Sequence, residues 1–367
     1  MINIHTLLKA MIDKNASDLH LRCGVAPTFR VNGSLYKVAV DPVTAEDMDT
    51  ILKALISPKK YETFKHNGNE LDFAIGIKGV GRFRVNAFSQ RNTPALAIRS
   101  VKFEIPEFST LSLPQVILDI SMRKRGLILV TGTTGSGKST LLASMINHIN
   151  DTISSNIITV EDPIEYLHRD KKSIIAQREI GNDTTSYEEG IKASFRQDPD
   201  ILLIGEIRDK ETMEVALSAA DTGHLVMSTL HTMNAVETIN RIVSFFPPHQ
   251  HDQTRLVLSN VLVSVISLRL LPKKDNSGLI PAAEILINTG SVADYIYDPE
   301  KSHLINSAIS EGYTQYGSQS FDQSLLQLYN DERISFECAK HYASNPDDFE
   351  LQVQGVQGTS DRRWMAH

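Results

Sequence analysis

The sequence predicts an α/β protein with a small first domain, a larger second domain and a helical C-terminal region. Its 367 residues are more than one ordinary hydrophobic core accommodates. Between residues 115 and 271, short apolar runs alternate with segments of helical periodicity. This alternation indicates a parallel sheet with helices covering both faces.

The composition argues against several classes of protein. A net charge of −7, from 37 Lys and Arg against 44 Asp and Glu, argues against nucleic-acid binding as the main activity. The two cysteines, Cys23 and Cys338, are far apart, which disfavours a disulfide framework or a cysteine zinc site and suits a reducing cytoplasm. The apolar segment Val261–Leu271 is shorter than the ~18 residues of a membrane span.

Residues 1–102 are expected to form the first domain. The chain starts with the periodicity of an amphipathic helix rather than with a signal peptide. A helical stretch is expected at Ala45–Lys65, and strands at Asp18–Arg22, Thr28–Val31, Leu35–Val38, Leu71–Ile77, Arg82–Ser89 and Leu96–Val101. Asn32-Gly33 predicts a hairpin turn, because both turn positions need positive φ. Residues 103–114 contain two prolines and are expected to be a linker.

Residues 115–290 are expected to form the second domain. Its strands are predicted at Leu127–Thr131, Ile157–Glu161, Ile201–Gly205 and His224–Leu230. In a parallel sheet of this kind, ligands bind at the carboxyl ends of the strands. Polar residues follow each of these strands, so we expect the functional site at this edge.

The first of these strands leads into a glycine-rich loop, GTTGSGKST, and a helical pattern from Lys138 onward. The loop fits the phosphate-binding pattern G-x-x-x-x-G-K-[ST] at every fixed position. Its backbone N–H groups surround phosphate oxygens, Lys138 reaches the β- and γ-phosphates, and the Ser139 hydroxyl binds Mg²⁺. An ordinary glycine turn is the alternative, which the strand–loop–helix context disfavours. The nucleotide-binding positions are Gly132, Thr133, Thr134, Gly135, Ser136, Gly137, Lys138, Ser139 and Thr140.

Two carboxylates lie at the ends of predicted strands that are consecutive in the chain. Glu161 ends one strand, and Pro163 stops that strand just after it. Glu206 follows Ile201–Gly205, an apolar run with the general form of a Walker B strand. Either carboxylate can hold Mg²⁺ or polarise the attacking water, and Glu206 is also a predicted metal ligand. For Glu161, a charged loop without catalytic role is the alternative.

Two histidines, His224 and His231, lie at the two ends of the last predicted strand. Their separation of seven positions points them to opposite faces, which disfavours a shared metal. One of them is a candidate sensor of the γ-phosphate, and the other a candidate contact to a neighbouring subunit. A buried, hydrogen-bonded structural histidine is the alternative for each.

The remainder of the chain is predicted to be helical. Residues 291–350 are expected to form a helical C-terminal region, and residues 351–367 a disordered polar tail.

Four segments resemble the Walker A, Asp box, Walker B and His box of the secretion-ATPase superfamily. They are, in order, GTTGSGKST, ITVEDPIEY, RQDPDILLIGEIRD and TGHLVMSTLHT. Together with ASDLHL and GRFRVNAF, they make nearly the whole chain similar to the type IV pilus retraction ATPases of the PilT/PilU kind. The resemblance implies a PAS-like N-terminal domain, a RecA-like P-loop domain and a homohexameric ring that binds ATP between the two domains.

The resemblance also implies roles for individual residues. Glu161 and Glu206 become the catalytic pair, with the question of which polarises water left open. His231 joins the catalytic group, and His224 the nucleotide-binding group. Arginines of the first domain are implied to complete the site, with Arg84 and Arg99 as catalytic candidates and Arg82 beside them. Solvated charge that protects sheet edges is the alternative for any single arginine.

Two departures narrow the resemblance to the accessory PilU type. The cysteines for the zinc module of assembly and type II secretion ATPases are missing, and SVADYIYDPE stands where the main motor has an AIRNLIRE-like segment. The expected activity is Mg-dependent ATP hydrolysis by a cytoplasmic motor for pilus retraction and twitching motility. It is expected to associate peripherally with the inner membrane, with a pilus platform protein and a second retraction ATPase as partners and without zinc or nucleic acid. The alternatives are an assembly or type II secretion ATPase, a nucleotide-gated adaptor without hydrolysis, and a nucleic-acid translocase, which the acidic balance disfavours.

Overall fold

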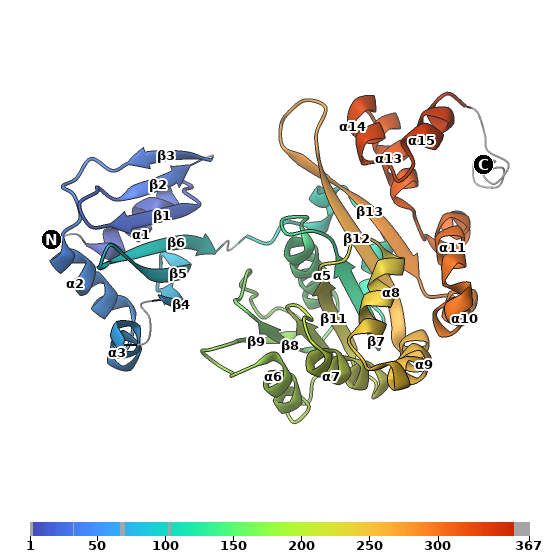
Figure 1. Ribbon diagram of the computed structural model, residues 1–367, viewed down its shortest axis with the longest axis horizontal. Coiled ribbons are helices and arrows are strands. Elements are labelled where there is room, and N and C mark those ends of the chain that lie inside the picture. The colour runs from blue at the N-terminus through green and yellow to red at the C-terminus, as the bar shows by residue number, and fades with distance from the viewer. Residues whose placement is uncertain (1–2, 32, 67–69, 102–103, 356–367) are drawn as a thin grey trace. The chain divides into compact units, whose positions relative to one another are not determined.

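The computed structural model describes residues 3–31, 33–66, 70–101 and 104–355. The chain divides into two compact units, of which the first comprises residues 1–104 and 165–167 and the second residues 105–164 and 168–367 (Figure 1). Both units combine sheets with helices, which confirms the predicted α/β class. No helix in the described ranges is long and apolar enough to cross a membrane.

The first unit is an antiparallel sheet covered on one face by helices. The strand order is β3-β2-β1-β6-β5-β4. The strands are β1 (Asp18–Arg22), β2 (Thr28–Val31), β3 (Ser34–Lys37), β4 (Glu70–Ile77), β5 (Gly81–Gln90) and β6 (Thr93–Val101). Helices α1 (Ile4–Asp13) and α2 (Ala45–Leu55) bury their apolar faces with Phe83 and Ile98 of this sheet. The opposite face carries the charged residues Asp18, Arg84 and Arg99 on three neighbouring strands.

Two predictions for this unit concern the helical stretch after the first hairpin and the turn of that hairpin. The predicted helical stretch Ala45–Lys65 is interrupted, because α2 ends at Leu55 and α3 (Pro58–His66) begins at a proline. A proline fits the first turn of a helix but not its interior, which explains the break. The pairing of Val31 with Ser34 leaves a two-residue connection with Gly33 at φ +81°, while Asn32 lies outside the described residues.

The second unit is built on a seven-stranded sheet in the order β13-β12-β7-β11-β10-β8-β9 (Figure 1). The strands are β7 (Gly126–Thr131), β8 (Asn156–Glu161), β9 (Ile174–Glu179), β10 (Ile201–Ile204), β11 (Leu225–Leu230), β12 (Leu262–Pro272) and β13 (Leu279–Ile287). All neighbours are parallel except the edge strand β13, which pairs antiparallel with β12.

Helices cover both faces of this sheet. One face packs on α4 (Val116–Ser121) and α5 (Lys138–Thr152). The other packs on α6 (Tyr187–Ser194), α7 (Lys210–Asp221), α8 (Ala235–Ser244) and α9 (His251–Val261). The central strands β7 and β11 are buried along their whole length, as strands covered on both faces must be.

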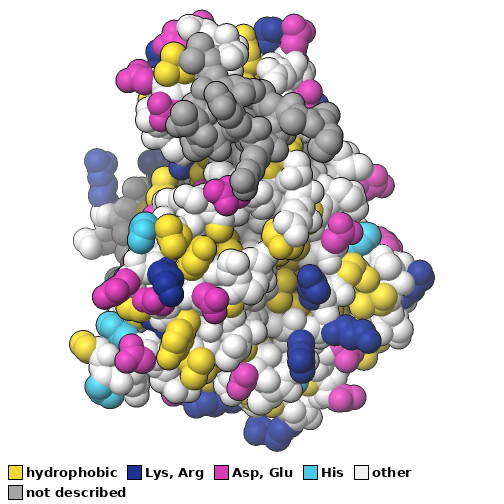
Figure 2. Space-filling view, turned by 90° about the vertical axis from the view of Figure 1, so that its right-hand side faces the viewer, with side chains coloured by type: hydrophobic (Ala, Val, Ile, Leu, Met, Phe, Trp, Pro, Cys, Tyr) yellow, Lys and Arg dark blue, Asp and Glu magenta, His cyan; other side chains and the backbone are white. Residues whose placement is uncertain are grey.

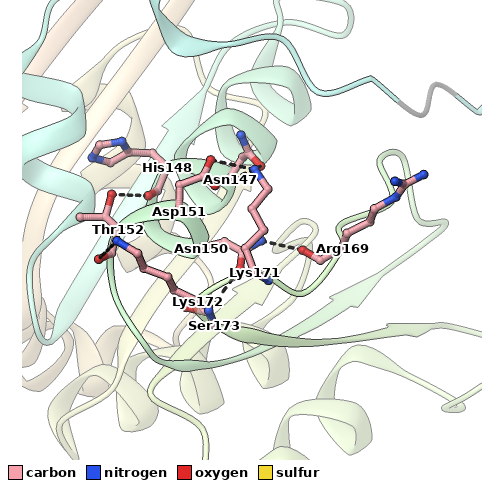
Figure 3. A network of polar contacts seen from close by, with 9 residues as sticks. All are labelled: Asn147, His148, Asn150, Asp151, Thr152, Arg169, Lys171, Lys172 and Ser173. Atoms are coloured by element: carbon pink, nitrogen blue, oxygen red, sulfur yellow. Dashed lines mark hydrogen bonds and ion pairs between the residues drawn. The ribbon is translucent and has the colours of Figure 1, made fainter.

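A polar network holds the far end of α5 (Figure 3). Asn150, which is 1% exposed, donates to the carbonyl of Arg169 at 2.7 Å and accepts from the N–H groups of Lys171 and Ser173 at 3.1 and 3.3 Å. The Lys171 ammonium pairs with Asp151 at 2.7 Å. These contacts join the helix that follows the glycine loop to the segment that enters β9, so the end of α5 has a fixed place against the sheet.

The C-terminal region is helical and part of the second unit's core. Its elements are α10 (Gly290–Tyr297), a 3₁₀ turn at Pro299–Leu304, α11 (Ile305–Glu311), α12 (Tyr313–Tyr316), α13 (Phe321–Asn330), α14 (Phe336–Tyr342) and α15 (Pro346–Val353). Leu271 and Ile280 of the edge strands share a hydrophobic cluster with Phe321 and Phe349. The Arg269 guanidinium lies 3.7 Å from the centre of the Phe321 ring and donates to the carbonyl of Tyr342 at 2.8 Å.

Figure 2 views the molecule from the side of these helices and shows hydrophobic side chains interspersed with charges of both signs. A disordered tail was predicted from residue 351, but residues 351–353 belong to α15, so the predicted start is too early. Phe349, 1% exposed, anchors this last helix, and one buried aromatic side chain is a weak signal in a polar sequence. Residues 356–367 lie outside the described residues.

Candidate active site

The glycine loop joins the end of β7 to the start of α5 and is shaped to receive phosphate. Gly132, Gly135 and Gly137 have φ of +138°, +81° and +98°, which side-chain-bearing residues rarely adopt. A Cβ atom at Gly132 would lie 2.5 Å from the carbonyl oxygen of Leu268, so only glycine fits there. Gly137 precedes the 15-residue helix α5 and lacks a side chain to cap it. The first N–H groups of α5 therefore have no capping side chain at that position, an arrangement that suits an anion.

Lys138 is held within the loop it follows. Its ammonium donates to the carbonyls of Gly132 and Thr133 at 2.7 and 2.9 Å, and the residue is 8% exposed. Burial lowers the pKa of Lys138, while the charge of Glu206 raises it. The neighbouring Ser139 side chain is exposed at the first turn of α5. An exposed hydroxyl oxygen beside a phosphate-binding loop is an oxygen ligand of the kind that Mg²⁺ binds.

The two predicted carboxylates lie at adjacent strand ends. Strands β8 and β10 are paired in parallel with Ile204 beside Val160, so Glu161, the last residue of β8, and Glu206, two residues after β10, lie at the carboxyl ends of neighbouring strands. Glu161 is 8% exposed and accepts hydrogen bonds from the Thr159 hydroxyl at 2.7 Å and the Gln177 amide at 3.2 Å. These contacts orient its carboxylate within the second unit.

Glu206 links the loop that follows β10 to the residue that follows β11. One oxygen, Oε1, lies 2.5 Å from Nη2 of Arg208, and the other, Oε2, lies 3.4 Å from Nε2 of His231. The side chain is 12% exposed, whereas those of Arg208 and His231 are 68% and 51% exposed. The carboxylate is therefore largely shielded from solvent, whereas its two partners are exposed to it.

The two histidines occupy different places. His231 follows β11 directly and lies with Glu206 at the carboxyl edge of the sheet. His224 precedes β11, so it lies at the opposite end of that strand, where its Nδ1 is 3.0 Å from the carbonyl oxygen of Ala219 and its ring lies tilted against that of Phe195, with the ring centres 5.7 Å apart. Within the second unit, the structure brings His231 but not His224 to the glycine loop and carboxylates.

The candidate arginines lie on the polar face of the first unit's sheet. Asp18 on β1, Arg99 on β6 and Arg84 on β5 are consecutive partners across three strands. Arg99 Nε donates to Asp18 at 2.9 Å, and the Arg84 side chain is exposed. Although burial raises the pKa of Asp18, hydrogen bonds from Ser17 and Arg99 hold it below its ordinary value. Two arginines, Arg84 and Arg99, thus lie side by side on this face, and the carboxylate of Asp18 holds one of them, Arg99, in place.

Arg208 and Glu284 are residues of this region that are not among the predicted site residues. The sequence signal for Arg208 is its position two residues after Glu206, in the segment GEIRD. Glu284 on β13 has no such signal, because its partner is 49 residues away. It is 8% exposed, and its Oε1 accepts the N–H of Ala235 at 2.8 Å, where α8 begins four residues after His231. Glu284 thus fixes the start of the helix that follows the His231 segment.

We expect the free energy of unfolding to fall as the pH rises from about 4.5 to about 7, with Glu284 as one cause. Burial raises the pKa of Glu284 from 4.5 to about 7, against the opposing effects of the Ala235 N–H and of Arg269. The folded protein therefore retains a proton that the unfolded chain releases, and this contribution is lost as the pH passes through the folded-state pKa.

The measurement is chemical denaturation at several pH values, for the wild type and for Glu284→Gln. The amide keeps an acceptor for Ala235 but cannot titrate, so the variant should show a flatter pH dependence in this range. Identical slopes for the two proteins would contradict the assignment.

The site thus combines a phosphate loop, a lysine and a carboxylate pair, which are the parts of a P-loop ATPase. The family described as Type II/IV secretion system protein matches residues 1–308. The chain is 39% identical to the type IV pilus ATPase PilU of Pseudomonas aeruginosa, over 95% of this chain and 90% of that protein. It is also 39% identical to the type IV pilus retraction ATPase PilT of the same organism, over 95% of this chain and 100% of that protein.

A crystal structure of the pilus retraction motor PilT with bound ADP has the same fold. It superposes with a TM-score of 0.88 at 44% identity, covering 95% of this chain and 99% of that one. The chain belongs to the PilT/PilU branch of the Type II/IV secretion system protein family. Like the other members of that branch, it is a P-loop ATPase.

Proposed function

We propose that this ATPase is a Mg-dependent, ring-shaped motor that drives type IV pilus retraction and twitching motility, as an accessory to a main retraction ATPase. The observation that carries the proposal is the grouping of Lys138, Glu206 and His231 at one edge of the sheet, in a chain that resembles PilU and PilT along nearly its whole length. We further propose that it acts as a homohexamer in the cytoplasm, bound peripherally to the inner membrane through a pilus platform protein.

The proposed chemistry is hydrolysis of the β–γ phosphate bond of ATP. The N–H groups of the glycine loop bind phosphate oxygens, and Lys138 exchanges its loop carbonyl partners for the β- and γ-phosphates. The exposed Ser139 hydroxyl and the Glu206 carboxylate are oxygen donors of the kind that fit Mg²⁺. Mg²⁺ bound there neutralises phosphate charge. Glu161 and Glu206 divide the remaining tasks, holding the water molecules of the site and polarising the one that attacks.

Arginines of the first unit are proposed to contribute to hydrolysis. Arg99→Ala and Arg84→Ala should each lower kcat at least tenfold and change nucleotide affinity less, because a guanidinium stabilises charge that grows in the transition state. The measurements are steady-state phosphate release, nucleotide titration and the mass of the assembly in solution.

Arg30→Ala is the matched control. Arg30 lies on the same sheet, and its Nε is 4.0 Å from the same carboxylate, Asp18. Unchanged kcat in both Arg99→Ala and Arg84→Ala, with assembly intact, would favour surface charge over catalysis.

The accessory role is tested in cells whose only retraction ATPase is this protein. Helix α10 ends at Tyr297, and Asp298-Pro299 then starts a 3₁₀ turn, so the helix cannot continue through this segment. Tyr297 is 54% exposed on a helix that otherwise buries Val292 and Ile296.

We expect cells whose only retraction ATPase is this protein to retract pili rarely, and we expect co-expression of a second retraction ATPase to restore retraction. Retraction at normal frequency and force without it would exclude the accessory role.

A further inference from the structure

Tyr187 is a half-buried residue of the second unit that has no part in the predicted site or in the proposed mechanism. It is the first residue of α6, directly after the capping residue Ser186. Its hydroxyl oxygen is buried and has no hydrogen-bond partner among the residues that the structure describes. An unsatisfied buried hydroxyl costs stability, so its retention calls for a reason.

The hydroxyl of Tyr187 lies between the ends of the two strands that carry the carboxylates. A Cβ atom built on Gly205, the residue before Glu206, would lie 2.9 Å from this oxygen and 3.3 Å from the Cα atom of Glu161. Gly205 therefore leaves the space that the hydroxyl fills. The phenol therefore lies at the carboxyl ends of β8 and β10, the edge at which a parallel sheet binds its ligand.

The electrostatic surroundings keep this hydroxyl protonated. Burial raises the pKa of Tyr187, and the carboxylates of Glu206, Asp162 and Glu161 raise it further, with Arg208 opposing them. A phenol in such surroundings is a hydrogen-bond donor throughout the working pH range. It cannot serve as a base.

We propose that the Tyr187 hydroxyl donates a hydrogen bond to the attacking water, which is held between Glu161 and Glu206. The water oxygen forms the new bond to the γ-phosphorus, and the bond from that phosphorus to the β–γ bridging oxygen breaks, which releases ADP. The proton of the water passes to a carboxylate of the pair and then to the phosphate. Tyr187 keeps its proton and fixes the position of the oxygen. This inference rests on the proposed roles of the two glutamates.

The test is Tyr187→Phe, which removes one oxygen atom and keeps the ring. We expect kcat at saturating ATP and Mg²⁺ to fall about tenfold, the loss of roughly one well-placed hydrogen bond. The KM for ATP and the Mg²⁺ concentration at half-maximal rate should stay unchanged, and Tm should be equal or higher. Tyr316→Phe, at a 45% exposed tyrosine on α12, is the control and should match the wild type in every measurement.

Two results would overturn the inference. A wild-type kcat with a raised Tm would show that the hydroxyl has no partner in the reaction. A raised Mg²⁺ requirement at unchanged kcat would assign the hydroxyl to the metal's water and not to the attacking one. Either result leaves ATP hydrolysis by the wild type intact, so failure of the inference is distinguishable from failure of the proposed function.

Gly205→Ala provides a second, independent variant. The added methyl displaces the Tyr187 hydroxyl, so kcat should fall in the wild-type background and fall less in the Tyr187→Phe background. Equal losses in the two backgrounds would show that Gly205 acts through some other contact, and would count against the proposal.

Discussion

Glu206→Gln is expected to bind nucleotide nearly as well as the wild type and to lose hydrolysis by roughly 10²- to 10⁴-fold. Glutamine has the size of glutamate, and its single carbonyl oxygen still accepts a hydrogen bond from Arg208, which lies 2.5 Å from Oε1 of the glutamate, while its NH₂ group takes the place of Oε2, 3.4 Å from His231. It lacks the negative charge that polarises water or attracts Mg²⁺. The measurements are phosphate release under saturating ATP and titration with a fluorescent nucleotide.

Glu214→Gln is a suitable control, because Glu214 is an exposed glutamate on α7. A parallel Glu161→Gln variant separates the two carboxylates. The residue that polarises water should lose turnover at any Mg²⁺ concentration, and the residue that holds the metal should regain part of it at high Mg²⁺. Wild-type turnover in Glu206→Gln would exclude a catalytic role for this residue.

Lys138→Ala is expected to weaken nucleotide binding about 100-fold and to abolish measurable hydrolysis. The lysine contacts phosphate in the ground state and in the transition state, and two charge-assisted hydrogen bonds of roughly 1.5 kcal/mol each give this factor. The same variant leaves the carbonyls of Gly132 and Thr133 without their ammonium donor, which loosens the loop itself.

Nucleotide titration distinguishes Lys138→Ala from Glu206→Gln, since only the lysine variant should fail to bind. Lys192→Ala, at an exposed lysine paired with Glu188 on α6, controls for loss of a positive charge. Retained affinity in Lys138→Ala would contradict the phosphate-binding role.

The elements that the sequence predicted best are those with a strong local signal. Strands β7, β8, β10 and β11 are buried apolar runs, and their predicted bounds agree with the structure to within one residue at every end. Strand β9 was missed, because Ile174–Glu179 is half exposed and its polar residues resemble a loop. Strand β12 was considered only as a possible membrane segment. Its assignment to the sheet depends on pairing with β7, which is 136 residues away at Thr131 and Ser267.

In the candidate site, too, the residues with a local sequence signal were predicted and those placed by long-range contacts were not. The glycine loop and the acids after β8 and β10 are local patterns, and the structure places Lys138, Glu206 and His231 together. Their catalytic roles remain predictions. Tyr187 and Glu284 are out of reach of such patterns, since each acts on residues 18 or more positions away through the fold. His224 shows that a local pattern can also mislead. It belongs to the segment that resembles the His box, but it lies at the end of β11 away from the glycine loop.

The contact between Arg269 and the C-terminal helices bears on how the protein can be engineered. The guanidinium lies against the Phe321 ring and bonds to Tyr342, while Leu271 and Ile280 of the same strand pair are covered by α13 and α15. A chain cut back to the ATPase sheet would expose this apolar edge and leave the arginine without its covering ring. Shortened versions should therefore aggregate, and a fluorescent reporter is best fused after Gly355, beyond the last helix that the sheet requires.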